Sequence, residues 1–391
     1  MSVLSSTAVE AIKAVGLLPR DCASCPLFKP CGGHQLEIIR TIGCASFADD
    51  GLPADRNDMN PLDEERYWRL WDDVDGLLDF SISTIKAVHS LDVPLYVPLL
   101  QHKYSRTATL SAPVVALHLY QIFRKSRDGH YLSRFADGAQ LRAYYRLRPD
   151  AKIILSGVAI DRRLELFWAH HRKDGVAAQL AKLGVSCVTV PNFSFFTDST
   201  RYQILRNRKR MVLVTERLSE AGVPVAPHLN AITDRDWEFC EDLLRDHPAT
   251  SVVTLEFQTG LATVAEGRGA LARVADMQQK LGRLLHPILV GGAKHYVDAQ
   301  VLFSRFTVID SRPFMEAQAR RTLVGDNTNG YRWTKTGTAD GLPIDAILEA
   351  NLVAYPEKLK LPSKQDEAAE SDTAQMELFD SRPYLTAQPV A

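Results

Sequence analysis

The sequence predicts an α/β fold in which eight parallel strands form a (β/α)8 barrel like that of triosephosphate isomerase. Strand-like apolar runs alternate with helix-like segments from about residue 93 to residue 322, which is typical of parallel sheets with right-handed crossovers. The span from residue 81 to residue 335 suits such a barrel. A doubly wound open sheet is the alternative. It is disfavoured because no glycine-rich nucleotide-binding fingerprint follows the first strand.

Short apolar runs bounded by turn residues indicate the strands. They cover residues 95–100, 152–158, 186–191, 223–229, 251–257, 287–292 and 306–310. An eighth strand is expected over residues 78–85 or near the end of the barrel. Helices are expected over residues 111–125, 162–183, 199–221, 233–246, 267–285, 293–303 and 313–322.

The composition favours one large barrel with appendages. The chain has 391 residues, a hydrophobic content of 46% and a formal net charge of −1. The protein is therefore not strongly basic overall, and any contact with nucleic acid needs a local basic patch. No apolar run approaches the roughly 20 residues that span a bilayer, and no charged segment precedes an apolar core at the N-terminus. We expect a soluble cytoplasmic protein.

Four regions are expected along the chain. Residues 1–80 should form a cysteine-rich segment with helices, and residues 81–335 the catalytic barrel. Residues 336–360 should form a C-terminal extension. Residues 361–391 are polar, acidic and poor in apolar side chains, so they should be a disordered tail.

Cysteines cluster near the N-terminus with the spacing C-x2-C-x5-C-x12-C. A cytoplasmic protein rarely uses four close cysteines for disulfides, and such thiolates can complete a four-coordinate metal site. We expect zinc or an iron–sulfur cluster there, with unrelated cysteines as the alternative. The proposed ligands are Cys22, Cys25, Cys31 and Cys44. Cys187 and Cys240 lie in apolar runs and are expected to be buried.

Polar residues follow the predicted strands at the end where barrel enzymes carry their active sites. The candidate catalytic residues are Asn192, His228, Glu256 and Asp310. The candidate substrate-binding residues are His102, Asp161, Gln258, Gly260, Gly291, Gly292, Lys294 and Arg312. Any one of these could instead be a satisfied structural group.

Asp310 is the strongest single candidate. It ends an apolar strand and precedes the turn Ser311-Arg312-Pro313, which should hold its carboxylate outward. A carboxylate there can act as a nucleophile, a base or a metal ligand. The alternative is that Asp310 caps the following helix.

A basic run occupies a predicted helix. Its cations are Arg206, Arg208, Lys209 and Arg210, and Arg320 and Arg321 could join the same surface. These side chains could position nucleic acid through its phosphates. The alternative is a solvated helix face.

The tail contains QMELF, which matches the pattern of bacterial sliding-clamp ligands. Gln375 would hydrogen-bond the rim of the clamp pocket, and Leu378 and Phe379 would fill it. The alternative is a small apolar patch that docks on the protein itself.

The stretch ILVGGAKHYVDAQ…FTVIDSRPFMEAQARR resembles the end of the barrel in tRNA-guanine transglycosylases. The matching positions are Leu289, Gly291, Gly292, Asp310, Pro313, Ala319 and Arg320, with Gly260 and Leu261 in an upstream loop. The chain departs from that family in two ways. Its cysteines are N-terminal, and Asn192 stands where a base-reading Asp is expected. The segment PNFSFFTDSTRYQILRNRKRM also resembles an uncharacterised bacterial and phage family.

Together with the tail, these features are similar to DNA-guanine transglycosylases that insert 7-deazaguanine bases into DNA. The resemblance implies that Asp310 attacks C1′ of a flipped deoxyguanosine and that a deazaguanine then displaces the carboxylate. One alternative is a metal-dependent nuclease or repair barrel with ions held by His102, His228, Glu256 and Asp310. The other is a non-catalytic DNA-binding accessory protein tethered to the clamp.

Overall fold

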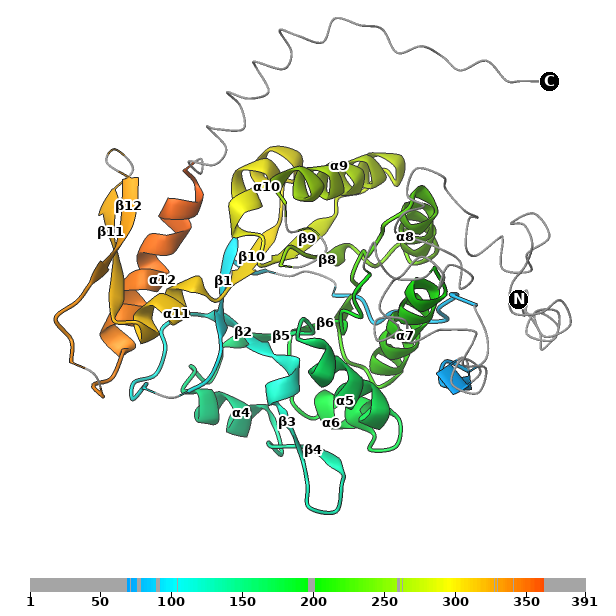
Figure 1. Ribbon diagram of the computed structural model, residues 1–391, viewed down its shortest axis with the longest axis horizontal. Coiled ribbons are helices and arrows are strands. Elements are labelled where there is room, and N and C mark those ends of the chain that lie inside the picture. Colours follow the sequence, from blue (N-terminus) through cyan, green and yellow to red (C-terminus); the bar gives the residue numbers. More distant parts are fainter. Residues whose placement is uncertain are drawn as a thin grey trace, which may run out of the picture.

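Eight parallel strands form the centre of the molecule and confirm the predicted fold class (Figure 1). The computed structural model describes residues 69–361 except 71, 76–78, 89–91, 104, 196–200, 259–260, 262, 327, 329 and 340. The order in the sheet is β7-β6-β5-β2-β1-β10-β9-β8. The strands are β1 (Tyr96–Leu100), β2 (Val114–His118), β5 (Lys152–Ser156), β6 (Cys187–Thr189), β7 (Val225–Ala226), β8 (Val252–Glu256), β9 (His286–Val290) and β10 (Thr307–Asp310).

The two end strands of this sheet approach each other, so the sheet is nearly closed into a barrel. An isolated parallel bridge joins His228, just after β7, to Thr254 in β8. The amide of Thr254 donates to the Pro227 carbonyl at 2.8 Å, and the amide of Leu229 donates to the Thr254 carbonyl at 2.9 Å. Val225, the first residue of β7, forms a second isolated parallel bridge, with Ala87.

Helices cover the outside of the strands (Figure 1). They are α4 (Gly138–Tyr145), α5 (Asp161–His171), α6 (Val176–Ala181), α7 (Arg201–Glu220), α8 (Asp234–Asp246), α9 (Val264–Lys280), α10 (Tyr296–Leu302), α11 (Arg312–Gln318) and α12 (Asp345–Leu359). Short 3-10 helices are η4 (Leu119–Gln121) and η5 (Ala293–His295). Two antiparallel hairpins lie outside the eight-stranded sheet. One pairs β3 (Phe123–Lys125) with β4 (Tyr131–Ser133), and the other pairs β11 (Arg321–Asp326) with β12 (Gly330–Lys335).

Alternation along the strands separates the barrel interior from the layer under the helices. Val97, Ile154 and Ile309 belong to one apolar cluster with residues from the other strands, which fills the interior. Their neighbours in sequence pack outward, as Tyr96 and Val308 do in a second cluster. Burying each such side chain contributes about 1.5–3 kcal/mol.

The eighth strand is β2, which lies in the segment predicted to be a helix over residues 111–125. That prediction was wrong because a short, fully buried apolar run has no distinguishing periodicity. The described part of residues 78–85 forms no strand. There, the backbone amide and hydroxyl of Ser83 bond to Glu216 of α7, the amide at 3.0 Å.

The single helix expected over residues 162–183 is two helices, α5 and α6. Gly175 separates them with φ of 58°, a left-handed conformation that glycine adopts without steric cost. Within the described residues, no helix is long and apolar enough to cross a bilayer.

Candidate functional site at the barrel mouth

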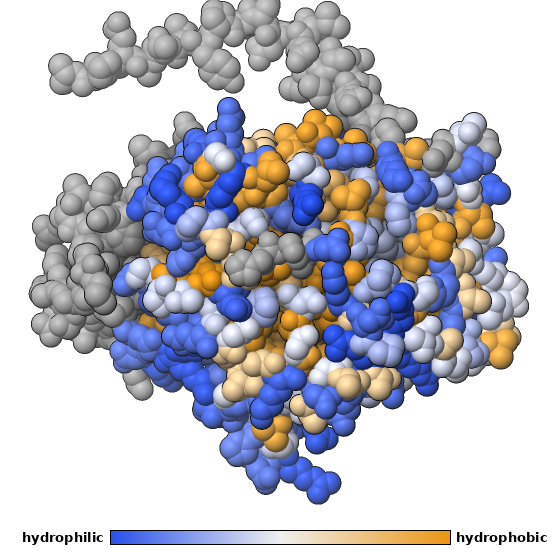
Figure 2. Space-filling model, turned by 180° about the vertical axis from the view of Figure 1, so that it is seen from behind, coloured by the Kyte–Doolittle hydropathy of each residue, from blue (hydrophilic) through white to orange (hydrophobic). Residues whose placement is uncertain are grey.

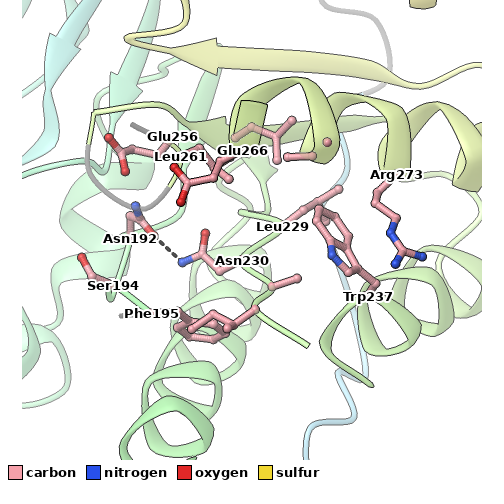
Figure 3. Close-up of a pocket in the computed structure, with 15 residues that line it drawn as sticks. Asn192, Ser194, Phe195, Leu229, Asn230, Trp237, Glu256, Leu261, Glu266 and Arg273 are labelled. Carbon is pink, nitrogen blue, oxygen red and sulfur yellow. Dashed lines mark hydrogen bonds between the residues drawn. The ribbon is translucent and has the colours of Figure 1, made fainter. Parts of the chain in front are cut away.

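A cavity of about 450 Å³ opens at the C-terminal ends of β6, β7 and β8 (Figure 3). This is the end of the barrel where the sequence predicted the site. Polar side chains from the three strand ends line one part of it, namely Asn192, Ser194, Asn230 and Glu256. Residues of α8 and α9, including Trp237 and Arg273, lie on the opposite side in Figure 3. The structure therefore brings together two of the predicted catalytic residues, Asn192 and Glu256, with groups from two helices.

Two amides at the base of the cavity have a defined orientation. The Nδ2 of Asn230 donates to Oδ1 of Asn192, and it also faces the carbonyl of Phe193 at 3.4 Å. Because a carbonyl only accepts, the Asn230 nitrogen must lie on this side. The amide nitrogen of Asn192 is then turned away from Asn230, and the amide oxygen of Asn230 is turned away from Asn192. The pair therefore carries one donor, the Asn192 nitrogen, beside one acceptor, the Asn230 oxygen.

Glu256 supplies a buried carboxylate to the same cavity. It ends β8 and follows Val252 and Thr254 on the inward-facing side of the strand, and it is 6% exposed. The backbone amide of Gln258 donates to its Oε1. A carboxylate group only accepts hydrogen bonds when it is ionised, and its two oxygens offer about four acceptor positions.

Aromatic and apolar side chains form the remaining walls. Phe195 is 8% exposed, and Trp237 projects from the first turn of α8. Both α8 and α9 begin beside the cavity with capping boxes, in which Thr233 and Asp236, and Thr263 and Glu266, exchange hydrogen bonds. The cavity can therefore hold a flat ring between aromatic walls and polar groups.

A buried charge cluster supports the loop that carries Asn230. Asp236 is fully buried and forms ion pairs with Arg208 at 2.6 Å and Arg201 at 2.9 Å. Its Oδ2 accepts hydrogen bonds from Arg201 and from the Ile232 and Thr233 amides, each at 3.0 Å. Burial opposes ionisation, but the two guanidinium groups outweigh it and hold the pKa of Asp236 well below its usual range. Arg208 also lies over the rings of Phe239, Phe195 and Phe80.

This cluster corrects the prediction for the basic run on α7. All four cations of the run are buried, between 2% and 7% exposed. Arg206 pairs with Asp73 at 2.7 Å, Arg210 with Glu165 at 2.8 Å, and Lys209 donates to the Asp79 carbonyl. They therefore form neither a phosphate-binding surface nor a solvated face, because packing and ion pairs occupy them.

Arg320 and Arg321 do not join the basic run either. They follow α11, on the other side of the barrel from α7 (Figure 1). Arg320 donates to the Leu342 carbonyl at 2.6 Å, and Arg321 pairs with Glu316 at 3.2 Å.

Asp310 points away from the cavity. Ile309 faces the interior, so the next side chain faces the outer layer, where Tyr355 of α12 donates to Asp310 Oδ2 at 2.6 Å. The amide of Arg312 donates to Oδ1 at 2.8 Å. Burial and the Asp310 charge raise the pKa of Tyr355 well above its usual value. Asp310 thus holds the turn into α11, whose N-cap residue is Ser311, and is not among the residues lining the cavity.

The Gly291-Gly292 turn serves backbone geometry and packing. Gly291 has φ of 70°, and a Cβ there would lie 2.5 Å from the Gln258 side chain. A Cβ on Gly292 would lie 2.8 Å from Leu289. These contacts explain why glycine stands at both positions.

The other predicted residues described by the structure are not among those that line the cavity. His228 is buried, which lowers its pKa to about 3, and it lines a separate cavity of about 20 Å³. His102 packs edge-on against Phe314. Asp161 is exposed at the start of α5, Lys294 lies in η5, and Arg312 lies 3.6 Å from Glu316.

Several predictions fall outside the described residues, namely those for Gly260, the four N-terminal cysteines and the tail motif. Within the described ranges, no group of three or more His, Cys, Asp or Glu side chains is arranged to hold a metal ion. Cys187 and Cys240 are buried, as predicted.

Sequence reasoning missed the helix residues of the site, namely Trp237, Glu266 and Arg273. Trp237 lies four residues after Thr233, the N-cap of α8, and is therefore in the first turn of a helix that follows a barrel strand. That position is the signal that could have identified it. A scan of protein-family models finds none that matches the chain, and a search of curated proteins finds none similar to it.

Proposed function

We propose that the protein is a base-exchanging enzyme that binds a guanine-type base of a nucleic acid in the cavity at the barrel mouth. The observation that carries this proposal is a buried carboxylate, Glu256, in one cavity with the paired amides of Asn192 and Asn230. The resemblance to guanine transglycosylases supplies the reaction class, and Glu256 takes the role first expected of Asp310.

The amide pair suits the edge of a guanine or 7-deazaguanine. These bases present a carbonyl acceptor next to a ring N–H donor. The Asn192 nitrogen would donate to the carbonyl, and the Asn230 oxygen would accept from the ring N–H. Phe195 and Trp237 would contact the faces of the ring.

The carboxylate would perform the exchange. An oxygen of Glu256 forms a bond to C1′ of the nucleotide as the bond from C1′ to the base nitrogen breaks, and the departing guanine takes up a proton. A 7-deazaguanine then gives up a proton, bonds to C1′ and displaces Glu256, which returns as a free carboxylate. Each half-reaction exchanges one bond for another and needs no oxidant or reductant.

The nuclease alternative has less support from the described residues. Its four proposed ligands do not converge, because Asp310 faces the outer layer and His228 lines the other cavity.

Incorporation of labelled guanine or a labelled 7-deazaguanine base tests the proposal. Single-stranded DNA, duplex DNA and tRNA would each be incubated with the wild type and with Glu256→Gln. We expect incorporation by the wild type and a loss of at least about 1,000-fold in the variant, as for removal of a covalent nucleophile. No incorporation by the wild type into any substrate would overturn it.

A further inference from the structure

The β3–β4 hairpin projects from the body of the barrel (Figure 1). Its inner face carries Phe123 and Tyr131, whose rings stack with centroids 4.9 Å apart against the core. The register pairs Arg124 with Leu132 on the opposite face. Seen from behind, the projection is a hydrophilic lobe with a small hydrophobic spot (Figure 2).

The hairpin carries an excess of positive charge. Arg124, Lys125 and Arg127 are exposed, and none of them forms an ion pair with any part of the chain that the structure describes. Asp128 is the one acidic residue between Phe123 and Ser133. The whole protein has a net charge of −1, so this concentration of cations is local. Beside Arg124, Leu132 is 42% exposed.

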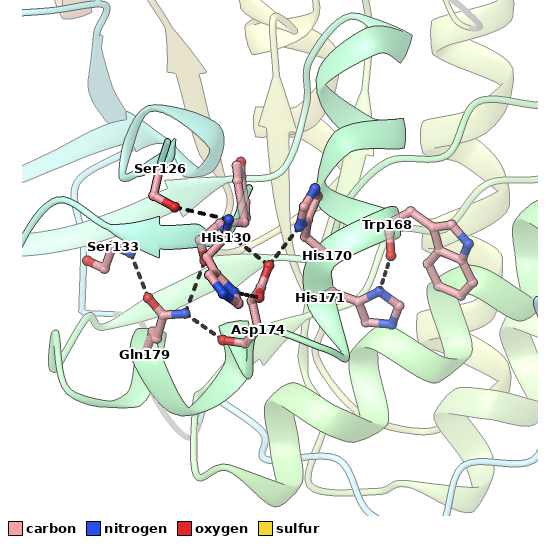
Figure 4. A network of polar contacts seen from close by, with 9 residues as sticks. Ser126, His130, Ser133, Trp168, His170, His171, Asp174 and Gln179 are labelled. Atoms are coloured by element: carbon pink, nitrogen blue, oxygen red, sulfur yellow. Dashed lines mark hydrogen bonds and ion pairs between the residues drawn. The ribbon is translucent and has the colours of Figure 1, made fainter. Parts of the chain in front are cut away.

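A buried carboxylate fixes the hairpin to the helices α5 and α6 (Figure 4). Asp174, whose side chain is 2% exposed, accepts from His130 Nδ1 at 2.8 Å, His170 Nδ1 at 2.7 Å and the Tyr131 amide at 2.9 Å. Gln179 adds a bond from its Nε2 to the Tyr131 carbonyl at 3.2 Å. Because these contacts order the hairpin before any partner arrives, binding would cost little further ordering.

The hairpin follows β2 through η4 and packs outside the barrel against α5 and α6, whereas the cavity lies at the ends of β6, β7 and β8. We propose that it binds the phosphate backbone of the nucleic acid whose base enters the cavity. Three cations that pair with no carboxylate among the described residues match a polyanion. The exposed Leu132 offers an apolar contact to a sugar or base. The choice of nucleic acid over another polyanion rests on the proposed function of the cavity.

Binding of labelled nucleic acid as a function of salt tests this proposal. Fluorescence anisotropy would compare the wild type with the variant Arg124→Ala/Lys125→Ala/Arg127→Ala on single-stranded DNA, duplex DNA and RNA. We expect affinity to fall at least 10-fold in the variant. The slope of log affinity against log salt should become shallower by roughly 2 to 3, since each phosphate contact contributes about 0.7–0.9.

A control variant removes the same charge elsewhere. Its substitutions to Ala are at exposed cations that already pair with carboxylates, namely Arg148, Arg245 and Lys280. It should bind nucleic acid within about 2-fold of the wild type. Equal losses in the two triple variants, or none in the hairpin variant, would overturn the assignment. So would a hairpin-dependent binding of anionic lipid vesicles without binding of nucleic acid.

The two proposals fail separately. Glu256→Gln should abolish base exchange but leave the affinity for nucleic acid unchanged. The hairpin variant should retain the wild-type affinity for free guanine, measured by calorimetry. If exchange is never observed but the hairpin variant still loses nucleic-acid binding, the hairpin assignment stands without the cavity chemistry.

Discussion

The amide orientation at the cavity base is set by one carbonyl. Phe193 faces the Asn230 nitrogen, Asn230 in turn faces the Asn192 oxygen, and the two groups turned away form a donor–acceptor pair. Asn192 itself was predicted from its place after a strand, but its orientation depends on Asn230, which lies 38 residues away in the sequence. No local pattern reveals such a pairing, because it arises only when β6 and β7 lie together.

Asn192→Ala should destabilise the protein and weaken base binding. The part-buried Asn230 nitrogen would lose the Asn192 oxygen and keep only its longer contacts to Phe193 and Met211. The free energy of unfolding should therefore fall by about 0.5–1.5 kcal/mol, the net contribution of one hydrogen bond. Urea titration measures the stability, and calorimetry with guanine measures the affinity. An affinity equal to that of the wild type would remove Asn192 from the proposed base site.

Asp236→Ala should be more severe, since it leaves Arg201 and Arg208 buried without their shared carboxylate. Loss of one partner of a buried ion pair costs about 3–5 kcal/mol. A change in the free energy of unfolding below about 1 kcal/mol would show that the cluster is not structural. Arg245→Ala is the control, because that cation is exposed and its removal should cost less than about 1 kcal/mol.

The Asp236 pair also predicts a pH dependence. The pKa of this carboxyl is lower in the folded protein than in the unfolded chain. Its contribution is therefore fully present above the unfolded-state pKa of about 3.9 and is lost as pH falls toward the folded value. Urea unfolding of the wild type and Asp236→Asn at several pH values below 5 should show a smaller loss of stability in the variant. Parallel curves would contradict the assignment.

At the scale of single elements, the sequence predicted the strands and helices whose apolar residues recur with a clear periodicity. It did not predict β2. Val114–His118 is buried on both faces, so its sequence is uniformly apolar and gives no sign of strand or helix. The basic run on α7 misled for a related reason. A run of Arg and Lys normally indicates a helix face that is exposed to solvent. Here Asp236 of α8 pairs with Arg208, and aromatic rings pack against Arg208 and Arg210.

The glycine turn after β9 gives a test at this scale. Gly291→Ala should destabilise the protein by about 1–2 kcal/mol, because its φ of 70° is unfavourable for alanine. Gly269→Ala, in the middle of α9 with no atom within 4 Å of the added Cβ, should stabilise it by about 0.5–1 kcal/mol. Thermal unfolding of the two variants should shift in opposite directions, and shifts of the same sign would contradict this reading.

At the scale of the whole molecule, strand alternation decides which predicted residues can act together. The barrel and the end that carries the site were predictable from the α/β alternation. The position of Asp310 was not predictable. It is the last residue of its strand, as Glu256 is, but its side chain faces the opposite side of the sheet. Glu256 faces inward and Asp310 outward, where Tyr355 holds it. Sequence position alone does not give that orientation without the register of β10 against β1 and β9.

Base exchange by matched carboxylate variants tests the central claim most directly. Incorporation of labelled guanine would be measured for the wild type, Glu256→Gln and Asp310→Asn at equal folded concentrations. The account predicts a loss of at least about 1,000-fold for Glu256→Gln and activity within about 10-fold of the wild type for Asp310→Asn. The reverse pattern, with activity abolished by Asp310→Asn and retained by Glu256→Gln, would contradict it.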